Sequence, residues 1–146
     1  MSASRSPVLL WLRGELRLSD NPTLQAALAT GRPVVPVFVL DDESAGTWAP
    51  GGASRWWLHH SLASLAADLA ARGTKLVLRR GRFAEVIPRL VAETGAAEVH
   101  AGIPTEPWAR ETYRRVIAAL APVKLHCHMT ALLHHPDRLR TQAGGP

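Results

Sequence analysis

The sequence has little of several residue types and segments that define whole classes of protein. It contains one cysteine, Cys127, which excludes an intramolecular disulfide. It has no apolar run of the roughly 20 residues that a membrane-spanning helix requires. The first residues do not show the charged and apolar regions of a signal peptide. We therefore expect a cytoplasmic protein with no membrane partner.

Several common functional motifs are also missing. No G-x-G-x-x-G motif follows a predicted strand, no Walker motif is present, and no Ser/His/Asp or Cys/His order suggests a catalytic nucleophile. The 15 arginines, against 2 lysines, give a net charge of +5. This charge suits attraction to nucleic acid phosphates, but a codon bias toward arginine and alanine gives the same balance. The arginines are scattered, which does not favour one dedicated DNA patch.

The 146 residues are enough for one domain with one core, because a domain of this size buries roughly 70% of its unfolded surface. Nothing in the sequence repeats internally. Residues 1–129 are expected to form an α/β domain, and residues 130–146, which show no periodic pattern, to form an exit linker.

Apolar runs alternate with segments of helical spacing, which predicts an α/β fold with right-handed crossovers. We expect a five-stranded parallel Rossmann-like sheet in the order 3-2-1-4-5, with helices on both faces. The predicted strands are 8–12, 34–40, 75–78, 98–101 and 123–128, and the predicted helices begin near Pro22, after Ser54, near Phe83 and at Pro107.

The helix boundaries follow from capping residues and prolines. Asn21 caps the first helix and Pro22 occupies its first position, and Leu24, Ala27 and Leu28 share one face. Pro88 is expected to kink the third helix or to delay its regular part. In the second helix Ser54 is the expected cap, and Leu58, Leu62, Leu65 and Leu69 form an apolar stripe.

Polar residues follow the first predicted strand, at the edge where open parallel sheets bind ligands. Arg13, Gly14, Glu15 and Arg17 lie there. Gly14 would let the backbone approach a ligand closely. The alternative is that Glu15 pairs with an arginine and that the loop is only a solvated connection.

Two other groups of residues have the chemistry of possible sites. The basic turn from Arg79 to Arg82 could contact phosphate or simply be solvated. His126 and His128 share one face of the last strand, with Cys127 on the other. Since only His134 and His135 are near and the spacing is not that of a zinc site, no metal site is predicted.

Five segments resemble DNA photolyases and cryptochromes, in the order in which that family has them. The stretch WLRGELRLSDNPTL is similar to the family's opening signature, W-F-R-x-D-L-R-L-x-D-N-P-x-L, with Gly14-Glu15 in place of a basic residue and Asp. The other segments are PVVPVFVLD (Pro33 to Asp41), SRWWLHHSLASL (Ser54 to Leu65), TEPWARE (Thr105 to Glu111) and ALLHHPDRLRTQAGGP (Ala131 to Pro146).

This resemblance implies that the chain is the N-terminal α/β domain, and that a helical domain absent from it holds FAD and the DNA lesion. The α/β domain would bind an antenna chromophore and pass excitation energy to that FAD. No catalytic residue is then expected in this chain, which alone would be inactive. DNA would be bound only through the full-length parent, and a monomer is expected.

The resemblance also bears on the kind of antenna. Folate-binding members have an Asn-Glu pair where this chain has Trp108 and Ala109, which argues against methenyl-tetrahydrofolate. Pro104 stands where deazaflavin-binding members often have Asp, and Tyr113 where an Asp commonly follows Arg. A deazaflavin or FMN remains favoured over the folate. The residues predicted to bind it are Arg13, Gly14, Asp41, Arg55, Trp56, Gly102 and Glu106.

The predicted site lies between Arg13-Gly14 and the segment from Gly102 to Glu106, where the two glycines leave the crevice open. Arg55 or Trp56 would flank the ligand, and Arg13 and Arg55 would meet an anionic tail. The alternative is an empty crevice, because Pro104, Trp108 and Ala109 depart from the antenna patterns of the family. Two other functions stay open: a cryptochrome-type photoreceptor or partner-binding module, and a free-standing nucleotide-binding α/β protein.

Overall fold

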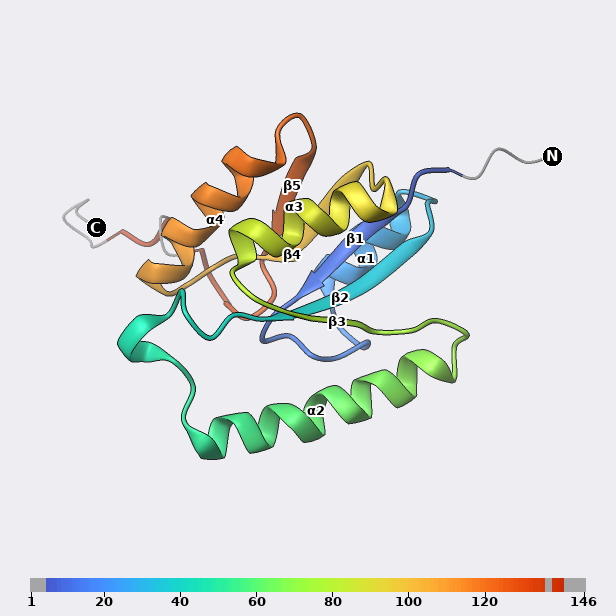
Figure 1. Cartoon of the computed structure of the whole chain (residues 1–146). Coiled ribbons are helices and arrows are strands. Elements are labelled where there is room, and N and C mark those ends of the chain that lie inside the picture. Colours follow the sequence, from blue (N-terminus) through green and yellow to red (C-terminus); the bar gives the residue numbers. More distant parts are fainter. Residues whose placement is uncertain (1–4, 136–137, 141–146) are drawn as a thin grey trace.

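A computed structural model describes residues 5–135 and 138–140 of the chain. Five strands form one parallel sheet in the order β3-β2-β1-β4-β5, as Figure 1 shows, so the predicted fold class and strand order are confirmed. The strands are β1 (Val8–Leu12), β2 (Val34–Leu40), β3 (Val77–Arg80), β4 (Glu98–Gly102) and β5 (Lys124–His128). The helices are α1 (Pro22–Ala29), α2 (Gly52–Ala70), α3 (Phe83–Thr94) and α4 (Pro107–Leu120), with a short 3-10 turn at Gly46–Trp48.

The central strand β1 is buried on both faces, and all five of its residues are buried. Leu9 and Trp11 belong to the core formed with α3 and α4. Val8, Leu10 and Leu12 belong to a second core formed with α1 and α2. The sequence VLLWL therefore has no polar position, as a strand covered by helices on both faces requires.

Strand β1 is the point at which the order of strand addition changes sides. β2 and β3 lie on one side of β1 in the sheet, and β4 and β5 lie on the other. The helices α1 and α2 cover the face of Leu10, and α3 and α4 cover the face of Trp11 (Figure 1). Trp11 pairs with Val37 of β2 and with Ala101 of β4. The carboxyl ends of β1 and β4 therefore form the topological switch point, where open α/β sheets bind ligands.

The start of α1 is as predicted. The Asn21 side chain accepts a hydrogen bond from the Leu24 N–H (3.1 Å), and Pro22 follows at the first helical position. Asn21 also donates to the Arg17 carbonyl (3.0 Å), which fixes the loop after β1 against the helix. Of the predicted apolar face, Ala27 is fully buried, but Leu28 is 58% exposed. Leu28 therefore lies on a part of this apolar face that is open to solvent.

Two predicted boundaries are wrong, that of α2 by three residues and that of β3 by two. Helix α2 begins at Gly52, because Gly51 takes the capping position and its carbonyl accepts the Arg55 N–H (3.0 Å). Strand β3 begins at Val77, because it pairs only with the last four residues of β2, starting at Val37. Arg79 and Arg80 consequently lie in an edge strand and not in a turn.

Of the two effects expected of Pro88, the delay of the regular helix is wrong, and the kink stays a prediction. Helix α3 begins at Phe83 and includes Pro88 in its second turn. The proline removes only the hydrogen bond that its N–H would donate to the Ala84 carbonyl. Within the described residues, no helix is long and apolar enough to cross a membrane.

Candidate ligand site at the ends of β1 and β4

Arg13 follows β1 directly, and aromatic rings surround its guanidinium group. The guanidinium carbon lies 5.7 Å from the ring centre of Phe83, and 5.5 Å from those of Trp108 and Tyr113. Its side chain is 17% exposed, and Nη2 lies 4.0 Å from a carboxylate oxygen of Glu106. The rings' negative faces attract the cation, so Arg13 holds a defined position at the switch point.

The aromatic rings continue into the core below Arg13. Trp11 stacks on Tyr113 with ring centres 4.7 Å apart, and its ring centre lies 5.0 Å from that of Phe83. The Tyr113 hydroxyl donates to the Gly102 carbonyl (2.9 Å). Burial raises the pKa of Tyr113, outweighing the opposing effect of Arg13, so the phenol remains a neutral donor.

Two side chains lie against Gly102 in the space that a larger residue would use. A Cβ atom at this position would be 2.8 Å from Glu15 Oε1 and 2.8 Å from Thr130 Oγ1. The expectation that Gly102 leaves the crevice open is therefore wrong, because Glu15 and Thr130 fill the space that its missing side chain provides. Gly14 does leave open space, since nothing lies within 4 Å of its Cβ position.

Glu15 is a buried carboxylate with one unused oxygen. The residue is 8% exposed, and Oε2 accepts the Gly14 N–H (3.1 Å), whereas Oε1 is buried and has no partner among the described residues. The alternative pairing of Glu15 with an arginine is not formed in this part of the chain. Arg17 instead donates to the carbonyls of Asp20 (2.8 Å) and Thr130 (3.1 Å). Arg17 thus holds the segment after β5 over the loop after β1.

Asp41 ties the end of β2 to the start of α3. Its Oδ1 accepts the N–H groups of Glu43 (3.0 Å) and Ser44 (2.8 Å). Its Oδ2 accepts the Ser44 hydroxyl and the Phe83 N–H (2.9 Å). Burial alone would raise the pKa of Asp41, but these hydrogen bonds together lower it. The carboxylate therefore positions Phe83, whose ring lies beside Arg13.

Arg55 and Trp56 lie at the start of α2. Arg55 pairs with Asp42 (2.9 Å) and donates to the Pro50 carbonyl (2.9 Å). Trp56 is 62% exposed, and its ring centre lies 4.4 Å from that of His60. Of the predicted site residues, the fold thus gathers Arg13, Gly14, Gly102 and Glu106 around the ends of β1 and β4. The part of all seven residues in ligand binding stays a prediction.

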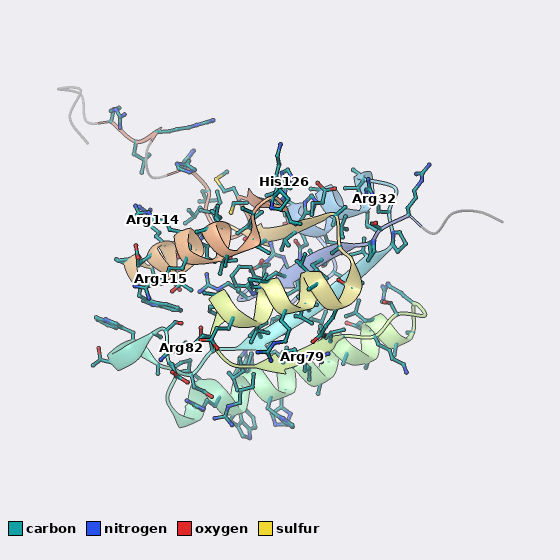
Figure 2. All side chains as sticks on the ribbon, turned by 45° about the horizontal axis from the view of Figure 1, so that its top comes forward. Arg32, Arg79, Arg82, Arg114, Arg115 and His126 are labelled. Atoms are coloured by element: carbon teal, nitrogen blue, oxygen red, sulfur yellow. The ribbon has the colours of Figure 1, made fainter. Side chains whose placement is uncertain are left out.

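The basic segment from Arg79 to Arg82, at the end of β3, does not present free cations. Each of its arginines forms an ion pair with a carboxylate: Arg79 with Glu93 (3.7 Å), Arg80 with Asp42 (2.7 Å) and Arg82 with Glu43 (2.7 Å). Figure 2 shows that the labelled arginines come from well-separated elements, with Arg114 and Arg115 on α4 and Arg32 at the far end of the sheet. The five labelled arginines are thus spread over three parts of the fold.

Three histidines and a glutamate lie together on the α1 face of β4 and β5. His100 Nδ1 is 3.0 Å from His128 Nε2, and the His100 ring stacks on that of His126. His126 Nε2 contacts a Glu98 carboxylate oxygen at 3.0 Å. The predicted common face of His126 and His128 is confirmed. Among residues 5–135 and 138–140, no group of three or more such side chains is arranged to hold a metal ion.

The histidine group predicts that acid destabilises the fold. Burial, followed by the charge of the neighbouring histidines, lowers the pKa values of His100 and His128 from 6.5. Below about pH 6.5 the unfolded chain therefore binds protons that the folded chain does not yet bind. We expect the free energy of unfolding to fall from pH 7 downward until the folded pKa values are passed.

The measurement is urea denaturation followed by circular dichroism across this pH range. His100→Gln should flatten the dependence, whereas His59→Gln, which replaces an exposed histidine of α2, should leave it unchanged. An equally steep loss of stability in His100→Gln would contradict this assignment.

The strand order defines an open Rossmann-like α/β domain, and Arg13, Gly14, Gly102 and Glu106 lie at the switch point of its sheet, where such folds bind ligands. The family model for DNA photolyase matches residues 8–146. The chain belongs to the DNA photolyase family.

Individual relatives agree with this assignment. The chain is 40% identical to a deoxyribodipyrimidine photo-lyase of Agrobacterium fabrum, an alignment that covers 100% of the chain and 30% of the relative. It is 37% identical to a cryptochrome DASH of Natronomonas pharaonis, in an alignment that covers 91% of the chain and 30% of that relative. Its fold matches the crystal structure of a bacterial class III photolyase from Agrobacterium tumefaciens with a TM-score of 0.90 and 38% identity, over 100% of the chain and 30% of that structure. The chain thus corresponds to the N-terminal α/β domain of these proteins and spans about a third of their length.

Proposed function

We propose that this chain is the antenna-binding domain of a light-driven DNA repair enzyme. Residues 1–129 would form the binding domain, and residues 130–146 would lead toward a helical domain that holds FAD and contacts DNA. Of this linker, residues 136–137 and 141–146 lie outside the described residues. The chromophore, when bound, would absorb light and pass its excitation energy to FAD. The whole protein would be a cytoplasmic monomer.

The observation that supports the proposal is the orphaned carboxylate oxygen of Glu15 beside Gly102. A buried acceptor without a partner is rare in folded proteins and needs an explanation. The ring N–H of a flavin or deazaflavin is a suitable donor, and Gly14, next to Glu15, leaves open space because nothing lies within 4 Å of its Cβ position. Thr130 lies against Gly102 and, being on the segment after β5, would have to move aside.

The neighbouring residues suit the same type of ligand. Arg13 has a guanidinium group fixed among aromatic rings, and its side chain is 17% exposed beside the end of β1. A cation held in this way binds an anionic tail without losing much conformational freedom. Trp108, one of the rings beside Arg13, replaces the Asn of folate-binding members, so we propose a deazaflavin or FMN in preference to methenyl-tetrahydrofolate.

The test is to titrate the purified chain with FMN, a deazaflavin and the folate, and to follow chromophore fluorescence. Glu15→Gln should weaken binding about tenfold, because hydrogen bonds to charged groups contribute roughly 1.5–3 kcal/mol. Gly102→Ala should weaken it further, since the added Cβ crowds Glu15 and Thr130. Gly52→Ala is the matched control, because nothing lies within 4 Å of its Cβ position.

Two outcomes would contradict the proposal. One is that none of the three chromophores binds, and the other is that binding is unchanged in both site variants. A preference for the folate would overturn the choice of chromophore but not the site. We also expect the chain alone, with added FAD and a reductant, to reverse no pyrimidine dimers, because its cores are filled by the sheet and its helices.

A further inference from the structure

A groove about 530 Å³ in volume lies between α1 and the C-terminal part of α2. It is on the Leu10 face of the sheet, opposite the aromatic cluster at Arg13. This volume is within the range of roughly 300–1,000 Å³ that is typical of small-molecule sites. Most of its lining is apolar, and the apolar residues are Leu10, Leu18, Leu24, Leu28, Val34, Pro36 and Leu69.

The groove exists because neither β3 nor α2 covers the first residues of β2. Strand β3 pairs with β2 only from Val37 onward, so Val34 to Pro36 extend beyond it. Helix α2 buries Leu65 and Leu69, but its side chains farther toward the N-terminus are more exposed, and Trp57 is 70% exposed. Leu28 of α1 is exposed from the other side. An apolar channel is thus left along the sheet.

Two arginines line the groove at one end. Arg32 precedes β2 and Arg72 follows α2, so both lie at the amino-terminal edge of the sheet, where Figure 2 shows Arg32. Arg32 donates to the Ser6 carbonyl (3.1 Å) and Arg72 to the Asp68 carbonyl (2.8 Å). Within the described part of the chain neither forms an ion pair. Each guanidinium has five N–H donors, so most of them are free to bind an anion.

We propose that this groove binds a small amphipathic carboxylate. Its alkyl chain would lie on Leu10, Leu24 and Leu69, and its carboxylate would be held by Arg32 and Arg72. The distribution of charge supports this class of ligand. An apolar channel with two guanidinium groups at one end, neither of them in an ion pair with a described residue, complements a molecule with one apolar and one anionic end. This site lies on the other face of the sheet from the crevice and does not depend on the proposed antenna function.

The experiment uses the full chain and decanoate as the probe, with binding measured by calorimetry. One decanoate should bind per chain, and decan-1-ol, which has the same alkyl chain but no charge, should bind at least tenfold more weakly. The double variant Arg32→Gln with Arg72→Gln should lose binding by roughly tenfold or more. Leu28→Glu, at an exposed position that tolerates substitution, should also lose it, because it places a carboxylate against the ligand.

The matched control is the double variant Arg114→Gln with Arg115→Gln. It removes the same charge from α4, where both arginines pair with Glu111, and should bind decanoate as the wild type does. The absence of decanoate binding, equal binding of the alcohol, or full binding by the Arg32/Arg72 variant would overturn the proposal. A dimer in sedimentation that Leu28→Glu dissociates would show that a second copy occupies the groove, and would overturn it too. Chromophore titration of the same samples reports separately on the crevice.

Discussion

Replacing Trp11 with alanine should lower the free energy of unfolding by about 3–5 kcal/mol, the range measured for large aromatic-to-alanine changes in cores. Trp11 is fully buried on the central strand. It stacks on Tyr113 and contacts Phe83, so its removal leaves a cavity between the sheet and both α3 and α4. Since whole domains are stable by only about 5–15 kcal/mol, this loss is a large part of the total.

Urea denaturation followed by far-ultraviolet circular dichroism measures this change without relying on tryptophan fluorescence. Trp57→Ala is the matched control, because Trp57 is 70% exposed and surface changes usually stay within about 0.5 kcal/mol. Trp11→Phe should lie between the two, since a smaller ring fills part of the cavity. Equal stability of Trp11→Ala and Trp57→Ala would show that the aromatic cluster does not support the fold.

Asp41→Ala should cost about 3 kcal/mol, the second largest loss that we expect. The substitution removes the acceptor of four hydrogen bonds and leaves the buried Phe83 N–H without a partner. An unsatisfied buried donor alone costs roughly 1–3 kcal/mol. Glu43→Ala removes a nearby carboxylate whose pair with Arg82 is exposed, so it serves as the control and should change stability by less than about 1 kcal/mol.

The Asp41 contribution should also depend on pH. Because the pKa of Asp41 is lowered in the folded chain, its stabilisation is complete above the ordinary value of 3.8. It is lost as the pH falls through the lower, folded value. The difference in unfolding free energy between wild type and Asp41→Ala should therefore shrink below pH 4. A difference that stays constant into strong acid would contradict the hydrogen-bonded, ionised state of this carboxylate.

The sequence was enough to predict the order and nature of the elements, because local signals agree with the fold. The unbroken apolar run of β1 indicates a strand covered on both faces, and Asn21-Pro22 marks the start of α1 through backbone chemistry alone. The start of β3 could not be predicted in this way. It depends on which residues of β2 are available for pairing, and that is a property of the assembled sheet.

The candidate site was only partly predictable for the same reason. Arg13 and Gly102 were found because they directly follow or end strands that meet at the switch point. The enclosure of Arg13 by Phe83, Trp108 and Tyr113 joins residues that are some 70 to 100 positions away in the sequence. Thr130 was not recognised, because its contact with the Gly102 position depends on how the segment after β5 turns back.

Asp41 shows what position alone leaves open. It follows a strand at the ligand-binding edge, which is the usual argument for a ligand contact, yet its two oxygens already accept four hydrogen bonds from the protein. A sequence does not reveal whether a carboxylate at such a position is satisfied by its own backbone.

The two outer strands of the sheet bear on how the isolated chain behaves at high concentration. An edge strand exposes unpaired backbone groups that can add a strand from another molecule, and charged residues and short strands oppose this. β3 has four residues, two of which are the exposed Arg79 and Arg80, and β5 begins with the exposed Lys124. A second copy that paired with β3 would have to bury these ion-paired side chains, which costs desolvation energy. The charged residues of β3 therefore act against aggregation, which makes this edge a poor place to remove charge when the domain is engineered for solubility.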